Sequence, residues 1–241
     1  MGRDDSRVGP AGVCYPDALV KTGNKRRVVT EQVSELTTNR LSIYLRCLTR
    51  LEQAGVETVS SQGLAEQFHL NAAQIRKDLA NFGEFGVRGV GYVVRDLRQQ
   101  LRRILGLDRR LKVVVMGAGK LGQALADYPG FGREGFEIVA MFDTDPSKVG
   151  QHSRSGIPIL HSRTLRAFAT RTGIDIAVLA VPGEVAQDVL DLIVAAGVRA
   201  VLNFSPGGLR VPETVRLKHV DLTVSLEGLS FFLAQGGEGG T

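Results

Sequence analysis

The sequence predicts an α/β protein in which a small helical domain precedes a doubly wound parallel sheet. The first observation is a strand-like apolar run that meets a glycine-spaced turn and leaves it as a helix, but only at residues 113–127. The second is the charge distribution: residues 1–110 hold 18 Lys and Arg against 12 Asp and Glu, whereas residues 111–241 hold 12 against 13. All the excess positive charge therefore precedes the glycine turn, which indicates a polyanion-binding surface on the first domain only.

Length and composition are those of an intracellular globular protein. The 241 residues are enough for one large domain or two modest ones, and 43% hydrophobic residues can build packed cores. The longest apolar runs fall far short of the roughly 20 residues of a membrane span, and the charged N-terminus lacks the apolar segment of a secretory signal. Cys14 and Cys47 have no partner at metal-ligand spacing, so we expect a reduced, cytoplasmic protein without disulfides, metal or membrane contacts. Residues 1–30 are predicted to be a mostly disordered basic tail.

Three short helices are predicted after the tail. The first begins at Thr37, which serves as its cap, and ends at Gly55. The second follows a serine cap at Ser60 or Ser61, and a turn, HLN, separates it from the third, which Asn71 caps. The apolar positions of the first two helices recur at helical spacing and consist of Leu41, Tyr44, Leu45, Leu48, Leu51, Leu64, Ala65 and Phe68.

The third helix is predicted to present a basic, amide-bearing face outward. Gln74 holds the capping-box position, three residues after Asn71. The inward side is apolar and consists of Ala72, Ile75, Leu79 and Phe82. The outward side consists of Ala73, Gln74, Lys77 and Asn81, with Arg76 on the flank. Amide side chains can reach base edges in a major groove, and Lys and Arg can neutralise phosphates.

A glycine-rich segment at residues 83–92, GEFGVRGVGY, alternates glycine with apolar residues around Arg88, as a two-stranded hairpin does. An amphipathic helix over residues 96–107 then leads into the second half. Helix, helix, recognition helix and wing is the order of a winged helix-turn-helix. The predicted DNA contacts are Ser61, Gln74, Arg76, Lys77, Asn81 and Arg88. A small helical bundle with a solvated basic face is the alternative that this pattern leaves open.

The second half alternates strand and helix signals, as a parallel sheet with crossover helices requires. After the strand LKVVVM, Gly117, Gly119 and Gly122 give the spacing G-x-G-x-x-G. The first glycine permits a tight turn, the second lets the backbone approach a pyrophosphate, and the third lets the helix pack on the strand. Asp143 ends the next strand, EIVAMFD, where a carboxylate accepts hydrogen bonds from a ribose diol and repels a 2′-phosphate. The pattern therefore predicts a Rossmann-like fold that binds NAD(H) rather than NADP(H).

Two later strands, DIAVLAVP and AVLNFSP, end at the edge where an open parallel sheet binds its ligand. The predicted cofactor contacts from these patterns are Gly117, Ala118, Gly119, Lys120, Leu121, Gly122, Asp143, Pro182, Asn203 and Ser205. Little chain follows Asp221, so we expect no second domain that could hold a substrate. The four histidines lie in no recognisable catalytic signature and are interpreted as surface or packing residues: His69, His152, His161 and His219. We therefore do not expect an enzyme.

Five segments carry a resemblance to a known family. They are QIRKDLANFGEFGVRGVGY, GAGKLGQALADYPGF, FDTDPSKVG, LNFSPGGLRVPETV and VDLTVSLEGLSFFL. In this order and spacing they resemble Rex, the redox-sensing transcriptional repressors of bacteria, over about residues 30–235. The resemblance implies a winged-helix DNA-binding domain at residues 31–107 and a Rossmann domain at residues 108–222 that senses the NADH/NAD+ ratio.

The resemblance also implies a homodimer that binds an operator. The segment 223–241 would contribute a helix, at about Ser225–Gln235, that is exchanged between subunits, followed by a flexible glycine-rich end. A dimer offers two recognition helices, so the operator is expected to be an inverted repeat. Tyr128 joins the expected cofactor contacts, and it forms the implied switch together with Asp221 and Arg46. In that switch Asp221 pairs with Arg46 in the DNA-competent form and with the Tyr128 hydroxyl when NADH is bound.

Two other functions stay open at this point. An NAD(H)-dependent oxidoreductase would use the same glycine turn, but the missing substrate domain argues against it. A CoA-binding module is the third possibility, because the NFSPGG loop also resembles the CoA-ligase nucleotide fold, although Asp143 fits a dinucleotide better. We favour a homodimeric repressor that is released from operator DNA by NADH.

Overall fold

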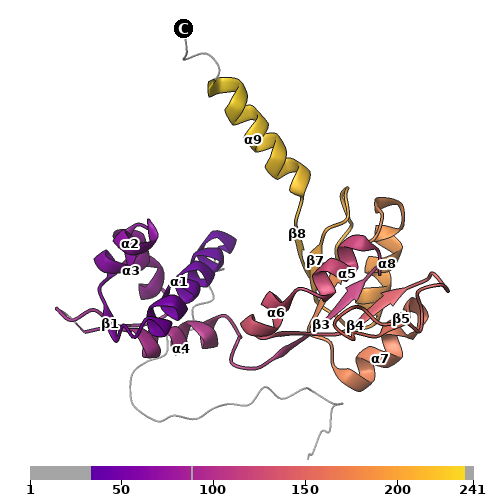
Figure 1. The fold of residues 1–241 in the computed structure, drawn as a ribbon, viewed down its shortest axis with the longest axis horizontal. Coiled ribbons are helices and arrows are strands. Elements are labelled where there is room, and N and C mark those ends of the chain that lie inside the picture. The colour runs from indigo at the N-terminus through magenta and orange to yellow at the C-terminus, as the bar shows by residue number, and fades with distance from the viewer. Residues whose placement is uncertain (1–33, 88, 237–241) are drawn as a thin grey trace, which may run out of the picture.

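The N-terminal part of the chain forms a helical unit with its own apolar core (Figure 1). The computed structural model describes residues 34–87 and 89–236, so the predicted tail at 1–30 and Arg88 lie outside the described residues. α1 (Glu35–Gln53) begins after Ser34, not at Thr37 as the sequence predicted. The Ser34 hydroxyl accepts the Thr37 N–H at 3.2 Å, so the cap lies three residues earlier and Thr37 is a buried helical residue.

α2 (Ser61–Phe68) and α3 (Ala72–Ala80) share this core with α1. Both begin at a predicted cap: Ser60 Oγ accepts from the backbone N–H of Gly63 at 2.9 Å, and Asn71 Oδ1 accepts from that of Gln74 at 3.0 Å. The predicted inward positions of the first two helices are buried, except Phe68, which is half-buried.

The glycine-rich segment forms the predicted hairpin over a single antiparallel bridge, between Val87 and Gly91. The longer pairing, which the sequence did not predict, joins β2 (Tyr92–Val93) to β1 (Thr58–Val59), which precedes α2. Gly91 has φ +97°, and a Cβ there would lie 2.6 Å from a carbonyl oxygen of β1, so glycine permits this close approach. α4 (Val94–Ile104) follows and begins two residues before the predicted helix.

Among the described residues, the rest of the chain builds a six-stranded sheet. Its strands pair in the order β5-β4-β3-β6-β7-β8, and every pairing is parallel. Numbered within the sheet, this is the order 3-2-1-4-5-6 of a Rossmann fold. The elements are β3 (Leu111–Met116), α5 (Lys120–Ala126), α6 (Pro129–Glu134), β4 (Phe136–Asp143), β5 (Ile159–His161), η1 (Ser162–Thr164), α7 (Leu165–Thr172), β6 (Ile176–Leu179), α8 (Gly183–Ala195), β7 (Ala200–Asn203) and β8 (Arg216–His219). The predicted strand LKVVVM and the position of Asp143 at the end of the next strand are confirmed.

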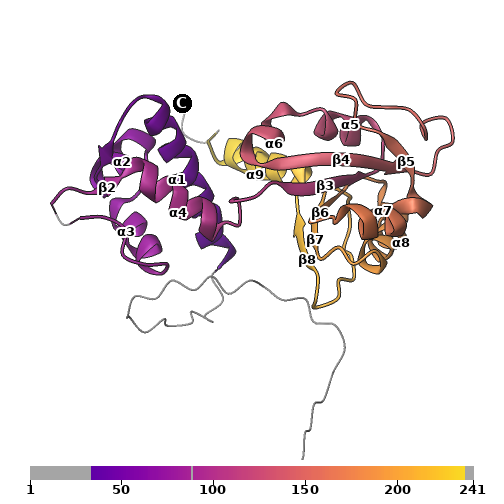
Figure 2. The same cartoon turned by 90° about the horizontal axis from the view of Figure 1, so that it is seen from below.

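Helices cover the two faces of the sheet unequally (Figure 2). α7 and α8 pack on one face, where Leu165, Leu190 and Ile193 are buried against the strands. α5 and α6 lie on the other face, but an apolar cavity of about 300 Å³ lies there between α6 and β8. Its walls come mainly from β3, β4, β6 and β7. Part of this sheet face is therefore left without a helix over it in the described chain.

α9 (Leu222–Gly236) projects from the end of β8 (Figure 1). It begins three residues before the predicted range because Asp221 caps it: the Asp221 Oδ1 accepts from the backbone N–H of Thr223 at 2.8 Å and of Val224 at 3.2 Å. Its large apolar side chains are 61–75% exposed, namely Leu222, Val224, Leu226, Leu229, Phe231, Phe232 and Leu233. The single chain therefore leaves a long apolar helix in contact with solvent.

Within residues 34–87 and 89–236, no helix combines the length and apolar character needed to cross a bilayer. The same part of the chain holds no cluster of three or more His, Cys, Asp or Glu side chains that could bind a metal ion. Cys47 is a buried free thiol in α1, and burial raises its pKa. Cys14 lies outside the described residues.

Candidate functional site

The glycine turn after β3 has the geometry predicted for it. Gly117 has φ +100°, and a Cβ there would lie 2.4 Å from the Ala180 carbonyl oxygen. A Cβ at Gly122 would lie 1.9 Å from the Gly117 carbonyl oxygen, whereas a Cβ at Gly119 would meet nothing within 4 Å. Packing of the chain therefore requires the first and third glycines, and the second leaves open space over the turn, as a bound pyrophosphate would need.

Asp143 closes this turn from the neighbouring strand. Its Oδ2 accepts the Ala118 N–H at 2.8 Å and its Oδ1 accepts the Asp145 N–H at 2.9 Å. Burial acts to raise the pKa of Asp143, but these backbone donors outweigh it and hold the pKa below its usual value. The carboxylate is therefore ionised at neutral pH and can accept hydrogen bonds from a ribose diol.

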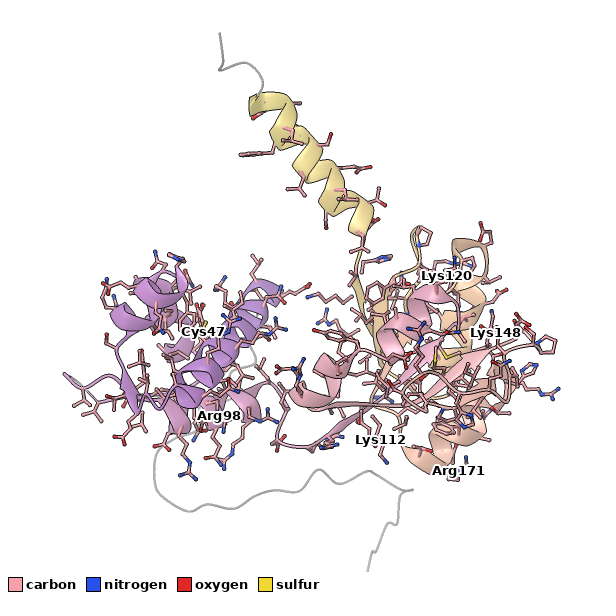
Figure 3. The ribbon with its side chains drawn as sticks, viewed as in Figure 1. Cys47, Arg98, Lys112, Lys120, Lys148 and Arg171 are labelled. Carbon is pink, nitrogen blue, oxygen red and sulfur yellow. The ribbon has the colours of Figure 1, made fainter. Side chains whose placement is uncertain are left out.

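Two lysines flank the turn. Lys148 Nζ lies 3.5 Å from Asp143 Oδ2 and 3.3 Å from Asp145 Oδ2, and its hydrogen bond to Asp145 is the main cause of its raised pKa. Lys120 is exposed at the first position of α5, beside Gly119. Both lysines lie at the part of the sheet unit that is away from the helical unit (Figure 3). Lys148 balances the charge of the two carboxylates, whereas the exposed Lys120 can offer positive charge to a phosphate group at the turn.

The ends of β6 and β7 meet at the same edge of the sheet. Ser205 Oγ donates to the Val181 carbonyl oxygen at 2.7 Å, and Pro182 precedes the first residue of α8. Asn203 is fully buried: its Oδ1 accepts the Ser205 N–H at 2.9 Å, and its Nδ2 donates to the Ser205 carbonyl oxygen at 3.1 Å. These bonds hold the ends of the two strands in place, and direct contact of Pro182, Asn203 or Ser205 with a cofactor stays a prediction.

His219, interpreted from the sequence as a surface or packing residue, contacts Asn203 at the end of β7. Asn203 Nδ2 lies 3.2 Å from His219 Nδ1 and 3.1 Å from His219 Nε2. Because Asn203 Oδ1 already accepts the Ser205 N–H, the amide nitrogen is the end that faces the ring. The signal that could have found it is the register of two parallel strands, which sets Asn203 opposite His219.

The outward face of α3 is basic, as predicted. Lys77 and Asn81 are exposed. Arg76 Nη1 donates to Ser61 Oγ at 2.8 Å, so two predicted DNA contacts from different helices lie together. Arg88, the predicted contact in the wing, lies outside the described residues.

A buried acid that the sequence analysis missed ties α3 to α1. Asp78 is 1% exposed and accepts hydrogen bonds from Arg40, the Tyr44 hydroxyl and the Gln74 amide. Its bond to Arg40 is the main cause that holds the pKa of Asp78 below its usual value, while burial raises the pKa of Tyr44. Gln74, which the sequence predicted to face outward, is therefore half-buried, and its side chain is hydrogen-bonded to Asp78 on the same helix. The missed signal is the position of Asp78, three residues after the buried Ile75 on the same side of the helix.

Comparison with known proteins identifies the family. A family model described as "Putative DNA-binding protein N-terminus" matches residues 32–80, and one described as "CoA binding domain" matches residues 108–207. The redox-sensing transcriptional repressor Rex of Syntrophomonas wolfei subsp. wolfei is 51% identical over 203 residues, which is 84% of this chain and 96% of that protein. A Rex of Thermus thermophilus is 47% identical over 200 residues, which is 83% of this chain and 93% of that protein. The chain belongs to the Rex family.

Solved structures of a Rex-family repressor, RSP, share the fold. RSP in complex with β-NAD+ and operator DNA has a TM-score of 0.79 and 39% identity, covering 86% of this chain and 99% of that chain. RSP in complex with β-NADH has a TM-score of 0.75 and 38% identity, covering 86% and 96%. This Rex chain therefore combines an N-terminal DNA-binding domain with an all-parallel Rossmann-like sheet.

The three residues of the implied Rex switch lie on different elements. Arg46 is exposed on α1, and Asp221 caps α9. Tyr128 is 54% exposed, with its ring edge-to-face against Phe131 at 5.2 Å between centroids. Among the hydrogen bonds and ion pairs of residues 34–87 and 89–236, none joins two members of this trio. The switch stays a prediction, and its contacts need a second subunit or another conformation.

Proposed function

We propose that this Rex chain is a redox-sensing repressor that binds operator DNA as a homodimer and is released when NADH binds. The observation that carries the proposal is the likeness, over 86% of this chain, to RSP in complex with β-NAD+ and operator DNA. The two sites that such a function needs have candidates on separate units: an open glycine turn on the sheet and a basic face on α3. The relatives are repressors, and we propose no catalytic role for this chain.

The dinucleotide would lie across the glycine turn, with its pyrophosphate over Gly119 and its adenosine ribose at Asp143. NADH carries a neutral dihydronicotinamide where NAD+ carries a cationic ring, and this is the difference that the protein must sense. Tyr128 would lie near that ring. The remaining expected contacts are Gly117, Ala118, Lys120, Leu121, Gly122, Pro182, Asn203 and Ser205.

The helical unit would dock on DNA as a winged helix-turn-helix. In this placement α3 enters the major groove, and the segment 83–92 forms the wing. Arg76 and Lys77 would neutralise phosphates, and Arg88 would border the minor groove. The outward basic face of α3 and the bond between Arg76 and Ser61 support this placement. A two-fold dimer then requires an operator with inverted-repeat half-sites.

Two apolar surfaces support a homodimer that exchanges α9. The large apolar side chains of α9 are 61–75% exposed in the single chain. The sheet face beside α6 carries an apolar cavity of about 300 Å³. Contact of either surface with water is unfavourable, and α9 of a second subunit would cover apolar surface on each side of the interface.

The switch would exchange the partners of one carboxylate. Asp221 would pair with Arg46 in the DNA-competent dimer. When NADH is bound, its carboxylate would instead accept a hydrogen bond from the Tyr128 hydroxyl. A ligand shifts such an equilibrium only by its different affinity for the two states, and the coupling is reciprocal. NADH that weakens operator binding is therefore itself bound more weakly on operator DNA.

A ligand titration tests the proposed function. Purified protein is titrated with NADH, NAD+, NADPH and coenzyme A, and its affinity for operator DNA, selected from a random library, is measured with each ligand present. We expect NADH to bind and to lower operator affinity, and coenzyme A to do neither. Coenzyme A is included because the CoA-binding family model matches residues 108–207. If coenzyme A, and not NADH, released the protein from operator DNA, coenzyme A would be the signal. Steady oxidation of NADH by small carbonyl compounds would instead indicate an oxidoreductase.

A further inference from the structure

A buried carboxylate lies behind the face of α3 that is proposed to enter the major groove. Asp78 is 1% exposed, and four donors point at it. Arg40 donates from Nε to Oδ2 at 2.5 Å and from Nη2 to Oδ1 at 2.8 Å, and the Tyr44 hydroxyl donates to Oδ2 at 2.9 Å. The fourth donor is the side-chain amide of Gln74, whose Nε2 lies 2.7 Å from Oδ1.

The charge of Asp78 decides which end of the Gln74 amide faces inward. The hydrogen bond from Arg40 holds the pKa of this carboxyl below its usual value, so the group is ionised at neutral pH. An ionised carboxylate only accepts hydrogen bonds. Gln74 must therefore turn its NH2 group toward Asp78, because its carbonyl oxygen would meet a negatively charged oxygen. One N–H is used inward, which leaves the Oε1 atom and the second N–H for a ligand.

The Gln74 amide then offers an acceptor, Oε1, beside a single N–H donor, and this pair is complementary to the major-groove edge of adenine. In the major groove adenine offers the N6–H donor beside the N7 acceptor, whereas guanine offers two acceptors, O6 and N7. We propose that Asp78 is a positioning residue that fixes the Gln74 amide, so that Gln74 selects adenine at one position of each operator half-site. The inference rests on the proposed docking of α3 and adds to it the base that is selected and the buried group that sets the choice.

The selectivity weakens when residue 78 loses its charge. An asparagine at this position can donate as well as accept, so the Gln74 amide can face it in either orientation. A good bidentate contact discriminates against the wrong base by about 5- to 150-fold. The substitution Asp78→Asn reduces this preference without removing any group that touches DNA.

The test starts from an operator that the full-length protein selects from a random DNA library. Affinities are then measured for that operator with each base pair substituted in turn, using wild type, Gln74→Ala, Asp78→Asn and the double variant. Wild type prefers an A·T pair by about 5- to 150-fold at one position of each half-site. Gln74→Ala abolishes this preference and Asp78→Asn reduces it. The double variant matches Gln74→Ala alone, because Asp78 acts through Gln74.

Three results would overturn the proposal. In the first, Gln74→Ala either loses a preference for guanine or keeps every base preference of wild type. In the second, Asp78→Asn keeps the full preference for adenine. In the third, the double variant loses more base preference than Gln74→Ala alone. The first needs only a substitution at a half-exposed position, so it decides whether Gln74 selects adenine even where Asp78→Asn does not fold.

Lys77→Ala separates this inference from the docking on which it rests. Lys77 is exposed on the same helix, and its loss should flatten the salt dependence of binding while the adenine preference stays. Unchanged affinity and salt dependence in both Lys77→Ala and Gln74→Ala would remove α3 from the DNA and overturn the docking as well. An intact Lys77 effect without an adenine preference would overturn the selection of adenine by Gln74 together with the role of Asp78, and would leave the docking of α3 standing.

Discussion

The two candidate sites of this Rex chain are built from different parts of the polypeptide. The cofactor turn is mainly backbone: Gly117, Gly119 and Gly122 contribute no side chains, and Asp143 holds the turn by accepting a backbone N–H. The DNA face depends on side chains that converge on the buried carboxylate of Asp78. The first site is therefore sensitive to atoms that are added, and the second to atoms that are removed.

The largest effect is expected from one methyl group added at Gly122. Its Cβ would lie 1.9 Å from the Gly117 carbonyl oxygen, and only a backbone shift relieves that contact. We expect Gly122→Ala to lower the free energy of unfolding by about 3 kcal/mol, the upper part of the range for overpacked sites. The matched variant Gly119→Ala meets nothing within 4 Å and should keep wild-type stability while its NADH affinity falls. Urea unfolding measures the stability of both variants, and wild-type stability of Gly122→Ala would contradict the expected sensitivity of this site to added atoms.

Atoms removed from the DNA face should have the next largest effect. Asp78→Ala leaves the Arg40 guanidinium and the Tyr44 hydroxyl without their shared acceptor. Breaking a buried pair costs about 3 to 5 kcal/mol, and because the Arg40 side chain is 32% exposed we expect about 2 kcal/mol. Urea unfolding at pH 7 measures this loss, and a loss below about 0.5 kcal/mol would show that the network does not stabilise the unit.

The same network predicts the sign of the pH dependence. Asp78 has a lowered pKa when folded, so its stabilisation is fully present above the unfolded pKa of about 4 and is lost as pH falls through the folded pKa. Asp78→Asn should therefore flatten the fall in stability below about pH 4. If stability still falls as steeply below pH 4 in Asp78→Asn, the fall belongs to other carboxylates with lowered pKa values, such as Asp143 and Asp175.

The backbone-built site could be predicted from the sequence more fully than the side-chain-built one. Glycine spacing and a carboxylate at a strand end are local patterns, so the roles of Gly117, Gly122 and Asp143 follow from short segments. Asp78 shares its helix face with buried apolar residues, but its partner Arg40 lies 38 residues away and no local pattern pairs them. The β1–β2 pairing escaped for a related reason, since two-residue strands are too short to show a period.

A substitution at Asp143 tests the side chain that holds the glycine turn of the backbone-built site. Asp143→Ala removes a charged acceptor for the ribose diol, so NADH affinity should fall by roughly 10- to 100-fold, the value of a hydrogen bond to a charged group. NADPH should lose less, because the carboxylate no longer repels its 2′-phosphate and Lys148 stays in place. Fluorescence titration with both nucleotides gives the ratio. Equal wild-type affinity for NADH and NADPH would contradict the assignment of Asp143 to the ribose.

The switch residues connect the two kinds of site. Asp221→Ala and Tyr128→Phe should still bind NADH yet lose much of its effect on DNA, a coupling of about 1 to 3 kcal/mol or 5- to 150-fold. Arg46→Ala should weaken operator binding even without NADH. Because Asp221 also caps α9, Asp221→Asn is the matched control, since it keeps a capping oxygen and removes the charge. Full release of Asp221→Ala from operator DNA at saturating NADH would rule out this switch.

The smallest effect is expected from a single exposed cation on the DNA face. Lys77 is exposed on α3, so Lys77→Ala should change the free energy of unfolding by less than about 0.5 kcal/mol. If Lys77 neutralises one phosphate, the slope of log affinity against log salt should become shallower by about 0.9. Arg166→Ala removes one exposed charge from α7 on the sheet unit and should leave the slope unchanged. An unchanged slope and full affinity in Lys77→Ala would place α3 outside the interface, and the side-chain network behind it would then stabilise the fold without serving DNA recognition.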